Sequence, residues 1–77
     1  VTTIDYELDV QEDVSISIYD LAGHKINELF NGVQNGGSHS IVWNGKDLSG
    51  STVAAGTYLY EIKVGNSRMT KKMVLLK

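Results

Sequence analysis

Hydrophobic residues in this chain recur at every second position within short runs. Residues 4–8 (IDYEL), 14–18 (VSISI) and 57–64 (TYLYEIKV) alternate in this way. Successive side chains of a β-strand point to opposite faces of the sheet, so a period of two predicts strands with one buried face. Glycine and asparagine separate the runs, and proline is absent. We therefore expect an all-β fold with short turns.

The segments between these runs extend the pattern. Residues 25–30 (KINELF) have helical spacing of their apolar side chains, but Gly23 before them and Asn31-Gly32 after them favour a short strand. We further expect a glycine-ended turn at 21–23, loops over 31–38 and 44–56, a strand over 39–43, a hairpin turn at Gly65-Asn66 and a last strand over 68–76.

About six or seven short strands with frequent turns are typical of an immunoglobulin-like antiparallel β-sandwich. The chain has 77 residues, which suits one domain over residues 1–77 rather than two. The inward-facing positions of the alternating runs predict the following core: Ile16, Ile18, Ile41, Trp43, Tyr58, Tyr60 and Ile62.

Composition excludes several kinds of function. The sequence contains no cysteine, so disulfides, thiolate metal sites and a cysteine nucleophile are impossible. The net charge is −2 and both signs are spread along the chain, which argues against nucleic acid as a partner. No apolar run approaches the ~20 residues that cross a membrane, so we expect no transmembrane segment.

Two groups of polar residues could carry chemistry, and both are weak candidates. The loop with Asn44, Asp47 and Ser49 could bind Ca²⁺, but it has one carboxylate and does not fit an EF-hand, so an Asx-type turn is the better interpretation. His24 and His39, with nearby acids and serines, could form a hydrolytic triad, but no Gly-x-Ser-x-Gly elbow is present. We expect no catalytic site, no metal and no cofactor.

The aromatic residues could instead form a platform on which sugars stack. Tyr58 and Tyr60 share an apolar face with Ile62, and Trp43 shares one with Ile41. A stacking platform needs exposed rings, whereas this alternation directs the rings inward, so core packing is the better interpretation.

An ordered set of motifs resembles a known family: 18–23 (IYDLAG), 42–45 (VWNG), Asp47 with Gly50, 55–58 (AGTY) and the basic, apolar ending 71–77 (KKMVLLK). The set resembles the type A C-terminal sorting domain of the type IX secretion system. That domain is related to the immunoglobulin-like domain of flagellar hook-capping proteins.

The resemblance implies a non-catalytic, C-terminal secretion-targeting and surface-anchoring module of a longer exported protein. Its partners would be the outer-membrane secretion machinery and an upstream catalytic or adhesin domain of the same chain, and its location secreted or on the cell surface. The resemblance assigns recognition by that machinery to the last residues: Lys71, Lys72, Met73, Val74, Leu75, Leu76 and Lys77. We expect their removal to leave most of the core intact.

Other interpretations stay open. The lysine pair Lys71-Lys72 could simply protect an edge strand from pairing with other chains. The domain could be a carbohydrate-binding or spacer module of a secreted glycoside hydrolase, or an immunoglobulin-like domain of a flagellar hook-capping protein.

Overall fold

A computed structural model describes residues 2–76 of the chain and shows the all-β fold that the sequence predicts. It contains six strands: β1 (Thr2–Leu8), β2 (Glu12–Tyr19), β3 (Lys25–Gln34), β4 (Gly37–Trp43), β5 (Gly56–Val64) and β6 (Ser67–Leu75). Within the described residues no helix is long and apolar enough to span a bilayer.

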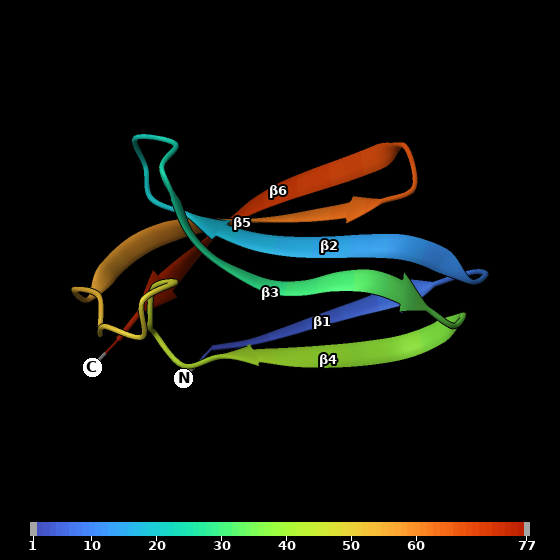
Figure 1. Ribbon diagram of the computed structural model, residues 1–77, viewed down its shortest axis with the longest axis horizontal. Coiled ribbons are helices and arrows are strands. Elements are labelled where there is room, and N and C mark those ends of the chain that lie inside the picture. Colours follow the sequence, from blue (N-terminus) through green and yellow to red (C-terminus); the bar gives the residue numbers. More distant parts are fainter. Residues whose placement is uncertain (1, 77) are drawn as a thin grey trace.

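The strands form two antiparallel sheets that pack face to face (Figure 1). One sheet has four strands in the order β3-β2-β5-β6, and the other pairs β1 with β4. The chain passes from the smaller sheet to the larger one and back before it finishes with the β5–β6 hairpin. This arrangement confirms the predicted immunoglobulin-like sandwich.

Strand β2 shows how the alternating pattern builds the core. Val14, Ile16 and Ile18 point between the sheets and are almost fully buried. The intervening Ser17 is also buried, although it lies on the opposite face of the sheet between two paired strands. Strand β2 lies inside the sheet, between β3 and β5, so its backbone groups are paired on both sides.

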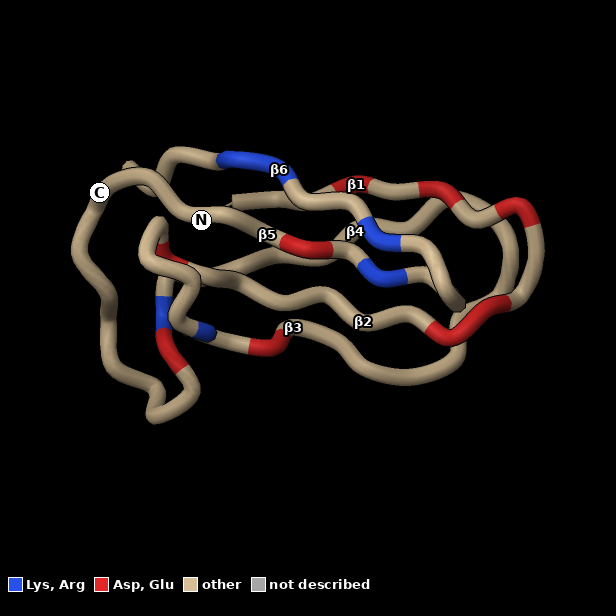
Figure 2. Tube along the Cα trace, turned by 90° about the horizontal axis from the view of Figure 1, so that it is seen from above, with Lys and Arg blue, Asp and Glu red and all other residues tan. Residues whose placement is uncertain are grey.

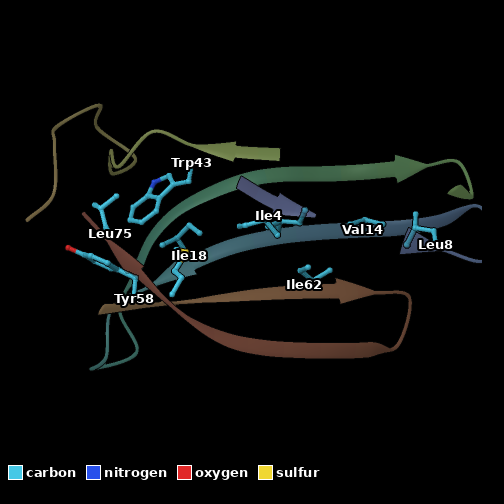
Figure 3. Close-up of a cluster of buried hydrophobic side chains, with 10 residues drawn as sticks. Ile4, Leu8, Val14, Ile18, Trp43, Tyr58, Ile62 and Leu75 are labelled. Carbon is cyan, nitrogen blue, oxygen red and sulfur yellow. The ribbon is translucent and has the colours of Figure 1, made fainter. Parts of the chain in front are cut away.

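The core joins both sheets, and Figure 3 shows Trp43, Tyr58 and Leu75 together at one end of it. Five of the seven predicted core residues are buried, while Ile41 and Tyr60 are half-buried and pack against the others. Five further residues complete the buried set: Ile4, Leu8, Val14, Met73 and Leu75.

The prediction of a loop over residues 31–38 is wrong. Strand β3 continues to Gln34, and β4 begins at Gly37. These polar residues are held in the sheet by pairing, since Asn31 lies opposite Ser15 and Gln34 opposite Glu12. Gly32 leaves room for the Phe30 ring, which would lie 3.5 Å from a Cβ at position 32.

Two turns have the chemistry that the sequence predicts. Gly23 has a φ of 88°, a conformation that glycine adopts without a Cβ clash, and its amide bonds the carbonyl of Asp20. Gly65 has a φ of 56° and, with Asn66, joins β5 to β6, where Val64 pairs with Ser67.

Candidate functional site

The segment to which the sequence assigned recognition forms the end of β6, the outermost strand of the large sheet. Lys71 and Lys72 are exposed, as are Val74 and Leu76. Met73 and Leu75 are only 9% and 3% exposed, so two of the six described residues of this segment belong to the core. Removal of the segment would therefore take two residues from the core, and the expectation that most of the core survives it stays a prediction.

The recognition role itself is not tested by these positions and stays a prediction. Lys77, the last residue of the predicted set, lies outside the described residues. The alternation along β6 places Lys72 and Val74 on one face and Lys71 and Met73 on the other, as the sequence predicts.

Strand β6 also carries most of the positive charge of this sheet. Arg68 Nη1 lies 3.7 Å from Glu61 Oε2 on β5, which faces the same way. Among the described residues β6 pairs with β5 alone, so its second edge presents backbone N–H and C=O groups. The edge is basic because Arg68, Lys71 and Lys72 occur without an acidic residue in the strand.

The long loop after β4 is fastened to the core through one carbonyl. Trp43 is fully buried, and its Nε1 donates a 2.9 Å hydrogen bond to the carbonyl of Lys46. Asn27 Nδ2 donates to the same oxygen at 2.8 Å. The amide of Leu48 then bonds the carbonyl of Ile26 on β3. These hydrogen bonds thus hold the loop against the sandwich.

In the candidate calcium loop, hydrogen-bond donors of the loop itself bind the Asp47 carboxylate. Asp47 Oδ1 accepts hydrogen bonds from the hydroxyl and amide of Ser49, at 2.7 and 3.0 Å, and from the amide of Ser51 at 3.0 Å. The Ser49 hydroxyl and then the Ser51 amide hold the pKa of Asp47 below its usual range. This is the Asx-type turn that the sequence favours, and within residues 2–76 no three potential metal ligands come together.

The two histidines belong to different ends of the sandwich. His24 lies in the β2–β3 turn, where its Nδ1 is 3.1 Å from Asp20 Oδ2. The backbone amide of His24 also bonds Asp20 and is the main reason that the pKa of this carboxyl is lowered. His39 is on β4, with its Nε2 2.7 Å from the carbonyl of Asn35 at the opposite end (Figure 1). The hypothetical triad is therefore not assembled.

The aromatic residues are arranged for packing. Trp43 and Tyr58 meet edge to face, with ring centroids 5.2 Å apart. The hydroxyl of Tyr58 donates a 2.6 Å hydrogen bond back to the carbonyl of Ala54. A tyrosine near the start of a strand that bonds its own upstream backbone is the tyrosine corner of immunoglobulin-like domains. Neither ring is available for stacking a sugar.

One hollow of about 580 Å³ lies over β1 and β4, lined by Asp5, Tyr6, Glu7, Ser38, His39 and Ser40. Its polar groups already bond one another, since Ser40 Oγ donates to Asp5 and Ser38 Oγ to Glu7. Tyr6 stacks on His39 and bonds Gln34, while burial raises the pKa of its hydroxyl.

The acidic face of β1 is the feature that sequence reasoning missed. Asp5 and Glu7 occupy alternate positions of the first strand, so a period of two places both carboxylates on one face. That signal was present in the sequence, but its importance depends on β1 being an edge strand, which only the sheet order shows.

Comparison with known proteins corrects the family. The model of the FlgD Ig-like domain matches residues 1–68. The crystal structure of FlgD from P. aeruginosa is similar, with 32% sequence identity and a TM-score of 0.72. The match covers 95% of this chain but 59% of that one. No curated protein matches.

These matches overturn the type IX sorting-domain interpretation and support the flagellar relative that was named beside it. The motifs that carried the resemblance, such as the Trp43-Asn44-Gly45 turn and the Tyr58 corner, serve the core and loops of the sandwich. They therefore indicate the fold more strongly than a particular function. The chain belongs to the FlgD Ig-like domain family.

Proposed function

We propose that this chain is a structural, non-catalytic immunoglobulin-like domain of a flagellar hook-capping protein of the FlgD type. The observation that carries the proposal is the similarity to FlgD of P. aeruginosa over 95% of the chain at 32% identity. Because the chain spans only 59% of that protein, its partner in this role is the remainder of a longer polypeptide.

The architecture suits a mechanical role. Hydrogen bonds tie the long loop to β3 and to Trp43, and Tyr58 ties the start of β5 back to Ala54, so the loops at this end of the sandwich are held by the core. Rigid domains with hydrogen-bonded loops can hold other parts of a protein in fixed positions. The secreted or cell-surface location expected from the sequence remains part of this proposal.

A domain exchange tests the proposal. The Ig-like domain of P. aeruginosa FlgD is replaced by this chain, and the chimera is expressed in a strain that lacks FlgD. We expect hooks to assemble, as scored by electron microscopy and swimming. A second chimera with Trp43→Ala removes the fully buried ring and should fail, because truncating a buried tryptophan destabilises a domain by about 3–5 kcal/mol.

The contrary result is equally clear. If the native chimera is folded and present at the level of wild-type FlgD yet assembles no hooks, the proposed role is wrong. Failure of both chimeras through degradation is separated from this outcome by immunoblotting and by circular dichroism of the purified chimeras.

A further inference from the structure

Three asparagines of this chain stand directly before a glycine: Asn31, Asn35 and Asn44. Asparagine is a chemically labile residue, because the backbone nitrogen of the next residue can attack its side-chain amide. Glycine favours the attack, since it has no Cβ to obstruct the approach. The dipeptide is the same at all three positions, so the folded structure decides which of them reacts.

The reaction needs only water. A solvent base removes the proton from the glycine N–H, and the nitrogen forms a bond to Cγ of the asparagine. The Cγ–Nδ2 bond then breaks, and the leaving nitrogen takes up a proton and departs as ammonia. The succinimide that remains adds one water molecule across either of its ring C–N bonds, which gives aspartate or isoaspartate.

Asn31 is protected by its place inside a strand. Closure of the succinimide ring brings Cβ and the following nitrogen to the same side of the Cα–C bond, whereas an extended backbone holds them apart. Asn31 and Gly32 belong to β3 and pair with Ser15 and Val14 of β2. Ring closure at Asn31 therefore requires that part of the sheet to open.

Asn44 is exposed, but the glycine after it is fixed in place. Gly45 is buried, and Leu75 Cδ2 lies 3.3 Å from the place where its Cβ would stand. The carbonyl of Gly45 also accepts a 2.9 Å hydrogen bond from the amide of Val53. Rotation of the backbone at Asn44 would displace Gly45 from both contacts, so this site is protected as well.

Asn35 has the least restrained backbone of the three. Asn35 and Gly36 join β3, which ends at Gln34, to β4, which begins at Gly37, and both are exposed. Neither residue is part of a strand pairing. Gly36 touches the β1–β2 turn on one side, where its Cβ would lie 3.2 Å from the Asp9 carbonyl oxygen.

A histidine contacts the peptide group that must react. His39 Nε2 lies 2.7 Å from the carbonyl oxygen of Asn35, and this carbonyl belongs to the same peptide group as the Gly36 nitrogen. Removal of the proton from that nitrogen places much of the negative charge on the oxygen. A hydrogen bond to an ionised acceptor is stronger than one to a neutral acceptor, so donation from Nε2 stabilises the reactive anion.

The surroundings make this hydrogen bond important. Acidic residues gather at the end of the sandwich that lies away from the labelled chain ends (Figure 2), where β3 passes into β4 (Figure 1). Their charge opposes a further negative charge on the Asn35 carbonyl. Tyr6 stacks on the ring of His39, with centroids 5.4 Å apart and planes 22° apart, and so helps to hold the donor in position.

We propose that Asn35 is the site of spontaneous deamidation in the folded chain, and that His39 promotes the reaction by its hydrogen bond to the Asn35 carbonyl. The product is aspartate or isoaspartate at position 35, with one more negative charge on the chain. The inference rests on these contacts and is independent of the hook-capping role.

Peptide mass spectrometry of the 77-residue chain tests the inference. The chain is aged at mildly alkaline pH, folded or in urea, and digested with trypsin, which releases residues 26–46 with all three sites in one peptide. In urea the three sites should react at similar rates. In the folded chain Asn35 should react at least about tenfold faster than Asn31 and Asn44, a difference in barrier of about 1.4 kcal/mol.

His39→Phe tests the role of the histidine, because it keeps a ring beside Tyr6 and removes the donor. It should slow the reaction of Asn35 about tenfold in the folded chain and leave the rate in urea unchanged. His24→Phe is the matched control, since it makes the same replacement in the exposed β2–β3 turn at the other end of the sandwich. It should not change the rate at Asn35.

Two results would overturn the inference. One is a folded wild-type chain in which Asn35 reacts no faster than Asn31 or Asn44, a comparison that needs no variant. The other is an equal rate at Asn35 in folded His39→Phe and His24→Phe. Unfolding of His39→Phe would show as faster reaction at all three sites and as a changed circular dichroism spectrum, and His39→Leu then serves as the second variant without a donor.

Discussion

Replacement of Leu75 by alanine provides a direct test of how the last strand contributes to the fold. Leu75 is 3% exposed and lies with Trp43 and Tyr58 at one end of the core (Figure 3). Its Cδ2 is 3.3 Å from the place where a Cβ would stand on Gly45. The side chain therefore fills the space between the core and the turn that follows β4.

The expected loss of stability follows from this environment. Leucine-to-alanine substitutions in cores cost about 2–5 kcal/mol, and the cost is larger where neighbours cannot collapse into the cavity. Here Trp43 is held by its bond to the Lys46 carbonyl, and Gly45 has a φ of 76° and no side chain to move inward. We expect a loss of about 3–4 kcal/mol. At roughly 0.05–0.15 kcal/mol per residue the whole domain has only about 4–12 kcal/mol.

Equilibrium unfolding in urea, followed by Trp43 fluorescence and by circular dichroism, measures this loss. Val74→Ala is the control, because Val74 is the adjacent residue of β6 and is 59% exposed. Its effect should stay within about 0.5 kcal/mol. Equal losses for the two variants, or a loss below about 1 kcal/mol for Leu75→Ala, would refute the burial argument.

Three further perturbations have expected outcomes. Gly23→Ala should cost about 1–2 kcal/mol by urea unfolding, because φ is 88° and the space around the Cβ is open, so strain alone acts; no loss would contradict it. Tyr58→Phe removes the hydrogen bond to the Ala54 carbonyl and should lower the free energy of unfolding by about 1 kcal/mol. An unchanged free energy of unfolding would argue against a stabilising tyrosine corner. The pKa values of Asp20 and Asp47 are lowered in the folded state, so their stabilisation is present above about pH 4 and lost as the pH falls through the lowered values. Urea midpoints should fall with acid less steeply in the Asp→Asn double variant than in the wild type, and identical slopes would disprove the assignment.

Local sequence was sufficient to predict most strands and the face that each buries. The period of two in 14–18 and 57–64 places Ile16, Ile18 and Ile62 inward, because backbone geometry alone sets that alternation. Gly23 and Gly65 likewise mark turns, since a positive φ suits glycine over any other residue.

The candidate sites depended on local chemistry in the same way. The Asx-type turn at Asp47 needs only donors within four residues, so its interpretation from sequence was sound. The family was harder to choose, because the motifs shared by related sandwiches fill the core and close the loops. Trp43 and Tyr58 would have these structural roles in any related sandwich, whatever its function.

Contacts between distant segments decided the rest. Residues 31–34 have no apolar period, yet they extend β3 because β2 offers them partners across the sheet. Met73 and Leu75 are core residues because β6 crosses the end of the sandwich near Gly45, about thirty residues away in the chain. The acidic and basic edges exist only because β1 and β6 are outermost in their sheets. Strand order is a property of the packed chain, since it is set by which hydrophobic faces cover one another, and no local pattern contains it.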